Sequence, residues 1–392
     1  MPTYEDRGVS PHKSEVKAAI RGLDPGLFPG AFCKALPDIY GNSPEHCFLL
    51  HADGAGTKSA VAYIHFRRHG DAAVFQGIAQ DSLVMNLDDL ACVGAMGPFV
   101  LSNTIGRNAK LVPGEVLRAV IAGYEGLAEK LGALGIEVHS CGGETADIGD
   151  LVRTIVVDSV LATRMARKDF IDCSKVRPDQ AIVGLASSGR ATYESTYNSG
   201  IGSNGFTSLR HELLTGRYRE EFPETFAPDI GDFAYMGRFD IDDPLPGTSM
   251  TVGEALLSPT RTYAPIIKEI IEGYKGHISA ILHNTGGGQT KCLNFGNNIR
   301  YIKENLFPTP PIFEFLGQQA GLPTREMFRV FNMGHRMEIC CDPEVSASIM
   351  AISEKFGVSG RLVGRTKYQE TGASLVIVTP SETIEYERIG SK

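Results

Sequence analysis

The sequence predicts a protein of two domains with mixed α/β and α+β architecture, and three observations support this prediction. The chain has 392 residues, which is more than one hydrophobic core usually holds. Short apolar runs typical of strands alternate with amphipathic stretches typical of helices. A polar, charged stretch at 164–179 separates two such series, so we expect domains at 1–175 and 176–392.

Composition excludes several classes of protein. Hydrophobic residues make up 42% of the chain and charged residues 21%, which suits a compact core. With 38 Lys and Arg against 46 Asp and Glu, the net charge of −8 argues against nucleic-acid binding. No apolar run is long enough to span a membrane, and the eight scattered cysteines are typical of reduced thiols. We therefore expect a cytoplasmic globular protein.

The first domain is predicted from five segments. An apolar run that stops at Asp53-Gly54 indicates a buried strand opening into a loop, and Pro113 marks the first turn of a helix. The predicted elements are a strand at 47–52, a helix within 80–94, a helix from 113 to Gly132 or Gly135, a strand at 137–141 ended by Gly142-Gly143, and a strand within 151–162.

The second domain repeats the alternation of strands and helices. Its predicted elements are a strand at 181–186, a helix at 206–214, a helix at 260–272, a strand at 278–283 and a strand near 337–341. Residues 216–253 hold prolines, aromatics and acids without clear periodicity, which indicates a surface insertion.

The segment DGAGTK at 53–58 follows the first strand and combines groups that suit a phosphate and its metal. Asp53 offers a carboxylate, Gly54 and Gly56 allow close backbone approach, and Thr57 and Lys58 add a hydroxyl and an ammonium group. It is not a Walker A loop, because the spacing between glycines is too short. A glycine-rich turn with a surface lysine is the alternative interpretation.

Four acids form a second candidate group, namely Asp81, Asp88, Asp89 and Glu144. Asp81 and Asp88 are seven residues apart and therefore share a face of the predicted helix. Carboxylate oxygens are the ligands that Mg²⁺ prefers. The alternative is that Asp88-Asp89 is a solvated helix face and Glu144 a turn residue.

Candidate binding residues in the second half lie in loops next to strands or helices. Gly286-Gly287-Gly288 offers backbone N–H groups of the kind that cradle phosphate oxygens, or else forms a flexible hairpin. Ser203-Asn204-Gly205 precedes a helix, where capping and ligand binding are both open. Asn332 lies just before a strand. No zinc spacing and no Gly-x-Ser-x-Gly elbow is present.

Taken together, these motifs resemble the AIR synthetase (phosphoribosylformylglycinamidine cyclo-ligase) family over nearly the whole chain. They occur in the order expected for that family: YEDRGV at 4–9, DGAGTK at 53–58, QDSLVMNLDDL at 80–90, GGETAD at 142–147, SNGFTSLR at 203–210, LLSPTRTY at 256–263, NTGGG at 284–288 and FRVFNMG at 328–334. Eight ordered motifs make coincidence implausible.

The resemblance implies a fold and a reaction. It implies an N-terminal α+β domain that dimerises through its sheet, a C-terminal α/β domain, and ATP in the cleft. The implied reaction converts formylglycinamidine ribonucleotide and ATP into aminoimidazole ribonucleotide, ADP and phosphate with Mg²⁺. The implied partners are a small ribonucleotide substrate and a second copy of the chain, with no nucleic acid and no membrane.

The resemblance also implies roles for individual residues. The catalytic candidates are Lys58, Asp89 and Asn204, and the metal candidates are Asp53, Asp89 and Glu144. The ATP-binding candidates are Asp53, Gly54, Gly56, Thr57, Lys58, Asp81 and Glu144. The substrate-binding candidates are Ser203, Asn204, Thr260, Arg261, Gly286, Gly287, Gly288 and Asn332.

The chain departs from the pattern of this family at four places. Gly202 stands where the family usually has a histidine before Ser-Asn-Gly, so the general base is not identified. Asp88 stands where an asparagine is typical. The segment 30–37 is a poorer version of a glycine-rich segment, and 216–253 is additional. These departures indicate a divergent branch.

Other functions remain open at this stage. Selenophosphate synthetase, thiamine-monophosphate kinase and the synthetase that makes formylglycinamidine ribonucleotide belong to the same superfamily and would also use ATP and magnesium. A non-catalytic paralogue that binds nucleotide is a rival of another class, motivated by Gly202 and the insertion. Release of ADP from the proposed substrate separates an enzyme from a binding protein.

Overall fold

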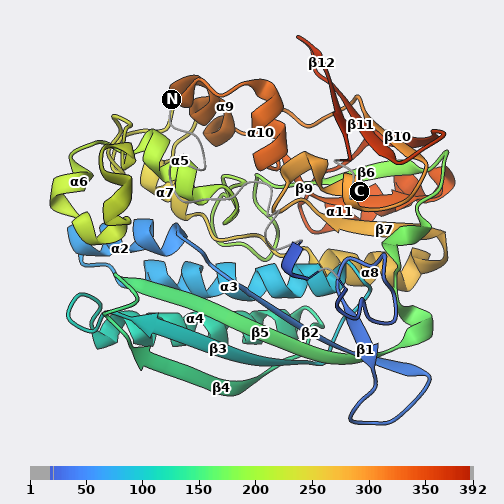
Figure 1. The fold of residues 1–392 in the computed structure, drawn as a ribbon, viewed down its shortest axis with the longest axis horizontal. Helices are drawn as coiled ribbons and strands as arrows, with labels where there is room; N and C mark the ends of the chain where they lie inside the picture. The colour runs from blue at the N-terminus through green and yellow to red at the C-terminus, as the bar shows by residue number, and fades with distance from the viewer. Residues whose placement is uncertain (1–17, 21, 389–392) are drawn as a thin grey trace.

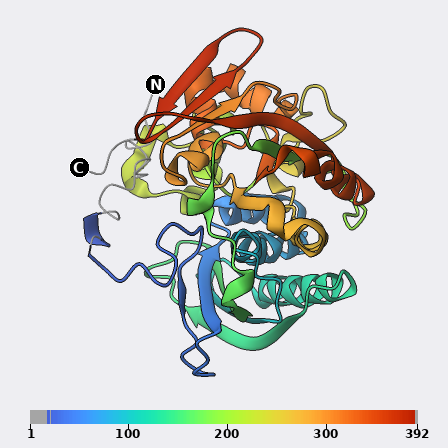
Figure 2. The ribbon, with the colours of Figure 1, turned by 90° about the vertical axis from the view of Figure 1, so that its right-hand side faces the viewer.

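The computed structural model describes residues 18–20 and 22–388, and the YEDRGV motif at 4–9 lies outside this part of the chain. The described chain forms two units, each built on its own β-sheet (Figure 1). Helices lie between the two sheets, as the view turned by 90° shows (Figure 2). This layering places the loops of one unit against those of the other.

The N-terminal unit contains a five-stranded sheet with the order β1-β2-β5-β3-β4. Its strands are β1 (Ala35–Pro37), β2 (His46–Gly54), β3 (Phe99–Arg107), β4 (Val138–Asp147) and β5 (Ile155–Ala166). Neighbours pair antiparallel except β3 and β4, which are parallel. Along β5, buried and more exposed residues alternate because one face of the sheet packs on helices and the other does not.

Three helices accompany this sheet, namely α2 (Lys58–His69), α3 (Val74–Ala91) and α4 (Gly114–Ala133). Pro113 precedes α4 as predicted, and Val116, Val120, Leu127 and Leu131 form its buried stripe. Helix α3 differs because every residue from Asp81 to Ala91 is buried. It lies between the five-stranded sheet and the C-terminal unit, so it has no solvent face in its second half (Figure 1).

The glycine pair at 142–143 does not end β4, contrary to the prediction of a strand at 137–141. The strand continues to Asp147, and its pairing with β3 shifts register between Leu101 and Asn103. A Cβ at Gly143 would lie 2.2 Å from the carbonyl oxygen of Asn103, and Gly142 has a φ of +84°. The two glycines therefore permit an irregularity within the strand rather than terminate it.

The C-terminal unit contains a seven-stranded sheet with the order β12-β11-β8-β10-β6-β9-β7. Its strands are β6 (Ala181–Ala186), β7 (Ile278–His283), β8 (Ile299–Lys303), β9 (His335–Cys341), β10 (Gly360–Tyr368), β11 (Ala373–Val378) and β12 (Thr383–Glu387). Only β8 and β11 pair in parallel. The predicted strands at 181–186 and 278–283 are confirmed.

Short helices surround this sheet. The α-helices are α5 (Phe206–Leu213), α6 (Tyr218–Glu221), α7 (Val252–Leu257), α8 (Ala264–Tyr274), α9 (Pro311–Ala320), α10 (Thr324–Val330) and α11 (Ser346–Lys355). The 3-10 helices within the described residues are Arg167–Asp169, Cys173–Lys175, Pro223–Thr225, Pro228–Phe233, Lys275–His277, Gly288–Asn294 and Pro343–Val345.

The helix predicted at 260–272 begins later, at Ala264. Pro265 occupies its first turn, where a missing N–H is tolerated. Residues 260–263 are not helical, and their backbone and side chains instead contact acids of α3. The periodic pattern of the sequence does not reveal this use of the preceding turn.

Residues 216–253 pack against the body of the protein and contribute to its core. Tyr218, Tyr235 and Ile241 are buried, and the rings of the two tyrosines lie 5.9 Å apart. Arg68 of α2 forms an ion pair with Asp240 at 2.7 Å. The segment therefore covers one end of α2 and is not a loose surface loop.

None of the helices in the described ranges has the length and apolarity that a membrane span requires. All eight cysteines are free, and seven are buried. These observations agree with the expectation of reduced, mostly buried thiols.

Two glycines on α4 give a test of how closely α4 packs against α3. A Cβ at Gly123 would lie 2.7 Å from the Cα of Gln76 on α3, whereas a Cβ at Gly126 meets nothing within 4 Å. We expect Gly123→Ala to lower the free energy of unfolding by about 1–3 kcal/mol, because backbone cannot yield easily. We expect Gly126→Ala to raise it by about 0.5–1 kcal/mol. Denaturant unfolding of both variants measures this, and equal effects would contradict the α3–α4 contact.

Candidate active site

A buried ion pair at the start of α2 makes hydrogen bonds to the C-terminal unit. Lys58 Nζ lies 2.9 Å from Asp81 Oδ1 and donates to the carbonyl oxygen of Ser258 at 2.6 Å. The same Asp81 oxygen accepts from the backbone N–H and the hydroxyl of Thr260, at 2.7 and 2.6 Å. Burial lowers the pKa of Lys58, and Asp81 opposes this effect. Three predicted ligand residues thus form an interdomain contact.

Asp88 makes a second contact between the units, about two helical turns further along α3. Its carboxylate accepts from the hydroxyl of Thr262 at 2.7 Å and from the backbone N–H of Tyr263 at 3.0 Å. Burial raises the pKa of Asp88. The alternative of a solvated helix face is wrong here, because Asp88 is fully buried and Asp89 is 8% exposed.

Asp89 lies between two histidines. Its Oδ1 is 2.7 Å from His283 Nδ1 at the end of β7, and its Oδ2 is 3.4 Å from His51 Nε2 on β2. His51 Nδ1 in turn lies 2.9 Å from Asn86 Oδ1. Burial would raise the pKa of Asp89, but the hydrogen bond and the charge of His283 outweigh it and lower the pKa. Both carboxylate oxygens are therefore already engaged.

The DGAGTK loop has the shape that the sequence indicated. Gly56 has a φ of +60°, and a Cβ at Gly54 would lie 1.7 Å from Asp158 Oδ1, so both positions require glycine. Asp53 is exposed, and its Oδ1 accepts from the N–H of Gly54 at 2.7 Å. Burial and then the charge of Asp53 raise the pKa of Asp158. An open acidic turn thus ends β2.

The C-terminal loops predicted to bind substrate lie close together. A Cβ at Gly286 would be 3.7 Å from Asn204 Nδ2, and Ser203 Oγ is buried with no hydrogen-bond partner. Gly288 has a φ of +48°, and a Cβ there would meet the carbonyl oxygen of Phe331 at 2.6 Å. The hydroxyl of Thr57 lies 2.9 Å from that of Thr207, so the DGAGTK loop adjoins the start of α5.

Two other candidates make internal hydrogen bonds instead. Arg261 is buried and forms a two-point ion pair with Glu194, at 2.9 and 2.6 Å. Asn332 accepts from the hydroxyl of Ser187 at 2.8 Å and donates to the carbonyl oxygen of Gly200 at 2.9 Å. In this structure both residues hold neighbouring loops together.

The three carboxylates predicted to hold a metal are not gathered at one place in the described part of the chain. Glu144 pairs with Thr104, which pairs with Asp158, which pairs with Gly54, so three strand spacings separate Glu144 from Gly54. At about 4.8 Å for each spacing this is roughly 14 Å. The physical reason is that β5 and β3 lie between β2 and β4, an order that the sequence does not reveal.

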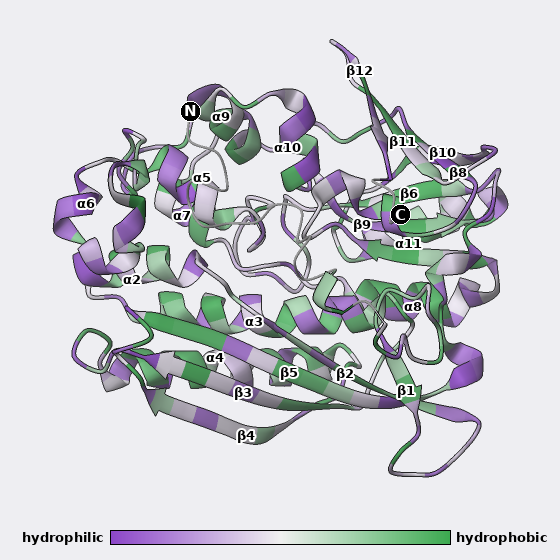
Figure 3. Cartoon of the chain, in the orientation of Figure 1, coloured by the Kyte–Doolittle hydropathy of each residue, from purple (hydrophilic) through white to green (hydrophobic). Residues whose placement is uncertain are grey.

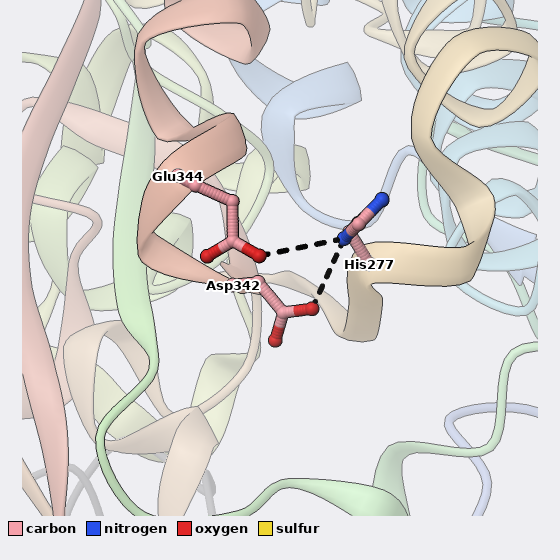
Figure 4. Close-up of side chains that lie close together, drawn as sticks. All are labelled: His277, Asp342 and Glu344. Atoms are coloured by element: carbon pink, nitrogen blue, oxygen red, sulfur yellow. Dashed lines mark hydrogen bonds and ion pairs between the residues drawn. The ribbon is translucent and has the colours of Figure 1, made fainter.

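A different group of side chains has metal-like spacing within the described ranges. The candidate ligand atoms of His277, Asp342 and Glu344 all lie within 4.8 Å of one another (Figure 4). His277 Nδ1 is 3.1 Å from Asp342 Oδ2, and Arg177 also forms an ion pair with Asp342. This partly exposed group lies at the start of β7, whereas His283 lies at its other end, so the group is separate from the predicted site.

A buried polar network packs against the glycine loop at 286–288. Lys303 forms an ion pair with Glu338 and donates to Gln289, which follows Gly288. Gln289 Nε2 donates to the carbonyl oxygens of Asn332 and His335, and His335 Nε2 lies 2.7 Å from Glu338. Burial would raise the pKa of Glu338, but Lys303 and His335 outweigh it and lower the pKa to about 2.

Several residues near these loops and acids were not singled out from the sequence, namely His51, Asn86, Asp158, His283, Asn284 and Arg336. Asn284 lies inside the NTGGG motif and His283 directly before it, so the motif was a signal that could have identified both. Asp158 and His51 gave no such signal, because their position depends on strand pairing.

Comparison with known proteins identifies relatives over most of the chain. Residues 35–162 match the N-terminal domain of the AIR synthase related proteins, and residues 177–376 match the C-terminal domain. The phosphoribosylformylglycinamidine cyclo-ligase of Methanocaldococcus jannaschii is 27% identical over 378 residues, 93% of this chain and 92% of the relative. That of Thermococcus kodakarensis is 32% identical over 349 residues, 85% of this chain and 86% of the relative.

Solved structures share the fold. The PurL of Thermotoga maritima complexed with ADP has a TM-score of 0.53 at 14% identity and covers 98% of this chain, which spans 51% of the PurL chain. The thiamine-monophosphate kinase of Stenotrophomonas maltophilia has a TM-score of 0.51 at 13% identity, covering 93% of this chain and 96% of the kinase. At these identities the likeness shows the fold alone.

The network below the glycine loop predicts a pH dependence of stability. Because the pKa of folded Glu338 is about 2, below its ordinary value of 4.5, the stabilisation is present above pH 4.5 and is lost as the pH falls towards 2. We expect Glu338→Gln to lower the free energy of unfolding at pH 7 by about 3 kcal/mol, since it leaves Lys303 buried without a counter-charge. We also expect a flatter acid limb in a stability–pH profile. An unchanged limb would refute the pairing.

Proposed function

The chain belongs to the family of AIR synthase related proteins, and from this membership we propose that it is an ATP-dependent cyclo-ligase. It converts formylglycinamidine ribonucleotide and ATP into 5-aminoimidazole ribonucleotide, ADP and phosphate, a step of purine biosynthesis. The observation that carries the proposal is the match to enzymes named phosphoribosylformylglycinamidine cyclo-ligase over both units of the chain.

The reaction requires the activation of an oxygen. The formyl oxygen attacks the γ-phosphoryl group of ATP, and the amidine nitrogen then closes the five-membered ring as phosphate leaves. No covalent bond to the protein is needed, so positioning and charge neutralisation dominate the rate. The contact between Thr57 and Thr207 supports this function, because it brings the proposed ATP loop next to the proposed substrate loop.

We assign ATP to the DGAGTK loop and the ribonucleotide substrate to the loops of the C-terminal unit. Asp53, Gly54, Gly56 and Thr57 are proposed to receive the ATP phosphates, since no atom outside the loop lies within 4 Å of a Cβ built at Gly56. Ser203, Asn204 and the glycines at 286–288 are proposed to receive the ribonucleotide. Lys58 is proposed to fix the loop through its bonds to Asp81 and Ser258, because these bonds occupy its charge.

ATP is proposed to bind as its magnesium complex. Mg²⁺ usually takes one or two protein carboxylates together with phosphate oxygens and water. Asp53 fits this requirement, because it is exposed beside the glycines of the loop. Asp89 and Glu144 do not join it within one subunit, since Asp89 faces two histidines and Glu144 lies across the sheet. The cation would supply charge neutralisation on the phosphates.

We propose that two copies of the chain associate through the outer face of the five-stranded sheet, which no helix of the described ranges covers. Leu50 pairs with Ala162 and Ala162 with Val100, so the three lie in one row across β2, β5 and β3. Leu50 is 58% exposed and Val100 47%. Apolar residues extend along β2 and β5 (Figure 3). An exposed apolar face of this kind marks an interaction surface.

The reaction is tested by following ADP release. We expect ADP and phosphate only when formylglycinamidine ribonucleotide and magnesium ATP are both present. Asp53→Asn should lower kcat/KM for ATP by about tenfold or more, because a charge-assisted contact is lost, and should leave the melting temperature unchanged. Asp150→Asn, a change of another exposed acid, is the control. Binding of ATP without ADP release would instead favour a non-catalytic paralogue.

The association is tested by placing a charge on the proposed interface. We expect Leu50→Lys to convert a dimer into a folded monomer, because a lysine there cannot be buried against a second copy without a partner. Ile121→Lys changes a residue of α4 that is similarly exposed, at 48%, and should leave the dimer intact. Light scattering after gel filtration measures both masses. A dimeric Leu50→Lys variant would count against this face.

A further inference from the structure

Arg336 on β9 is a buried cation without an ion-pair partner among the described residues. The residue is 1% exposed, and no carboxylate of the described ranges lies within ion-pair distance of it. Its Nη1 donates to the carbonyl oxygen of Ile201 at 3.1 Å, and its Nη2 donates to that of Arg261 at 2.8 Å. Its Nε is buried with no hydrogen-bond partner. Such a charge is costly to bury unless something balances it.

Asp88 supplies a balancing charge from the other unit. The charge of Arg336 is one of the influences that oppose the effect of burial on the pKa of Asp88. Both side chains contact the same short segment. Asp88 accepts from Thr262 and Tyr263, while Arg336 binds the carbonyl oxygen of Arg261 and lies 5.7 Å above the ring of Tyr263. The acid and the guanidinium are thus linked through residues 261–263.

Gly202 leaves room for the guanidinium. A Cβ at position 202 would lie 3.3 Å from Arg336 Nη1, so a histidine there would press directly on the cation. Gly202 and Asp88 are two of the places where this chain departs from the family that it resembles. Gly202 adjoins Arg336 directly, and Asp88 contacts the segment 261–263 that Arg336 also binds.

Unsatisfied polar groups adjoin Arg336. The backbone N–H of Asn284 donates to the carbonyl oxygen of Arg336 at 2.6 Å, and neither polar atom of the Asn284 side chain, which is 2% exposed, has a partner. Ser203 Oγ, two residues from the Ile201 carbonyl that Arg336 holds, also lacks a partner. A guanidinium, an amide and a hydroxyl with unused hydrogen-bond donors are groups that bind phosphate oxygens.

We propose that Arg336 binds the phosphate group of the ribonucleotide substrate next to Ser203 and Asn284, with Asp88 as its counter-charge. This assignment rests on the proposed function and adds a specificity residue to it. Arg336 would thus offer the phosphate a permanent positive charge, whereas Gly202 offers no side chain.

The test compares a phosphorylated substrate with its dephosphorylated form. Arg336→Met removes the charge and keeps an apolar stem, and Asp88→Asn removes the counter-charge so that the double variant folds without an unpaired acid. We expect the double variant to lose tenfold or more of the preference in kcat/KM for formylglycinamidine ribonucleotide over its riboside. Arg300→Met with Glu385→Gln, which removes an exposed pair at 2.7 Å on the same sheet, should keep the preference.

Titration with ribose 5-phosphate and ribose separates failure of this assignment from failure of the proposed reaction. If the wild-type protein binds ribose 5-phosphate but releases no ADP, the reaction is wrong, and loss of that binding in the double variant still supports Arg336. A folded double variant that keeps the wild-type preference, or the wild-type affinity for ribose 5-phosphate, would show that Arg336 only braces the loops. That result would overturn the inference.

Discussion

The architecture depends on one set of interactions, the contacts that the acids of α3 make with the C-terminal unit. Asp81 accepts from Lys58 and Thr260, Asp88 from Thr262 and Tyr263, and Asp89 faces His283. Carboxylates this deeply buried are tolerated only when donors surround them. The donors come mainly from residues 260–263 and from the end of β7, so the helix fixes both segments at once.

This arrangement determines where the loops of the cleft can lie. Residues 258–263 are held against α3 by hydrogen bonds. Arg336 binds the same segment and also the carbonyl oxygen of Ile201, which precedes Gly202. The Ser203 loop is therefore positioned relative to α3, and hence to the DGAGTK loop that begins α2. Placement of a phosphoryl donor near its acceptor follows from packing between the units rather than from either unit alone.

Much of the fold could be predicted from the sequence, because local patterns determine it. The apolar runs at 181–186 and 278–283 are central strands, and Pro113 marks the start of α4. The predictions that failed depend on contacts distant in sequence. Gly142-Gly143 reads as a strand end until Asn103 is placed beside it, and residues 260–263 read as helix until the α3 acids bind them. The motifs predicted one site for Asp53, Ser203 and Gly286, but they could not show that strand order removes Glu144 from Asp53 or that Lys58 is already paired.

The buried acids of α3 also limit how this protein can change by exchange of its parts. A C-terminal half taken from another member of the fold would have to bring a carbonyl for Lys58, two hydroxyl residues before its helix α8 and a histidine at the end of β7. A mismatch at any of these positions would leave a buried charge without a hydrogen-bond partner in such a chimera. The two halves are therefore expected to be inherited as a matched set, and sequence drift on one side of the junction constrains the other.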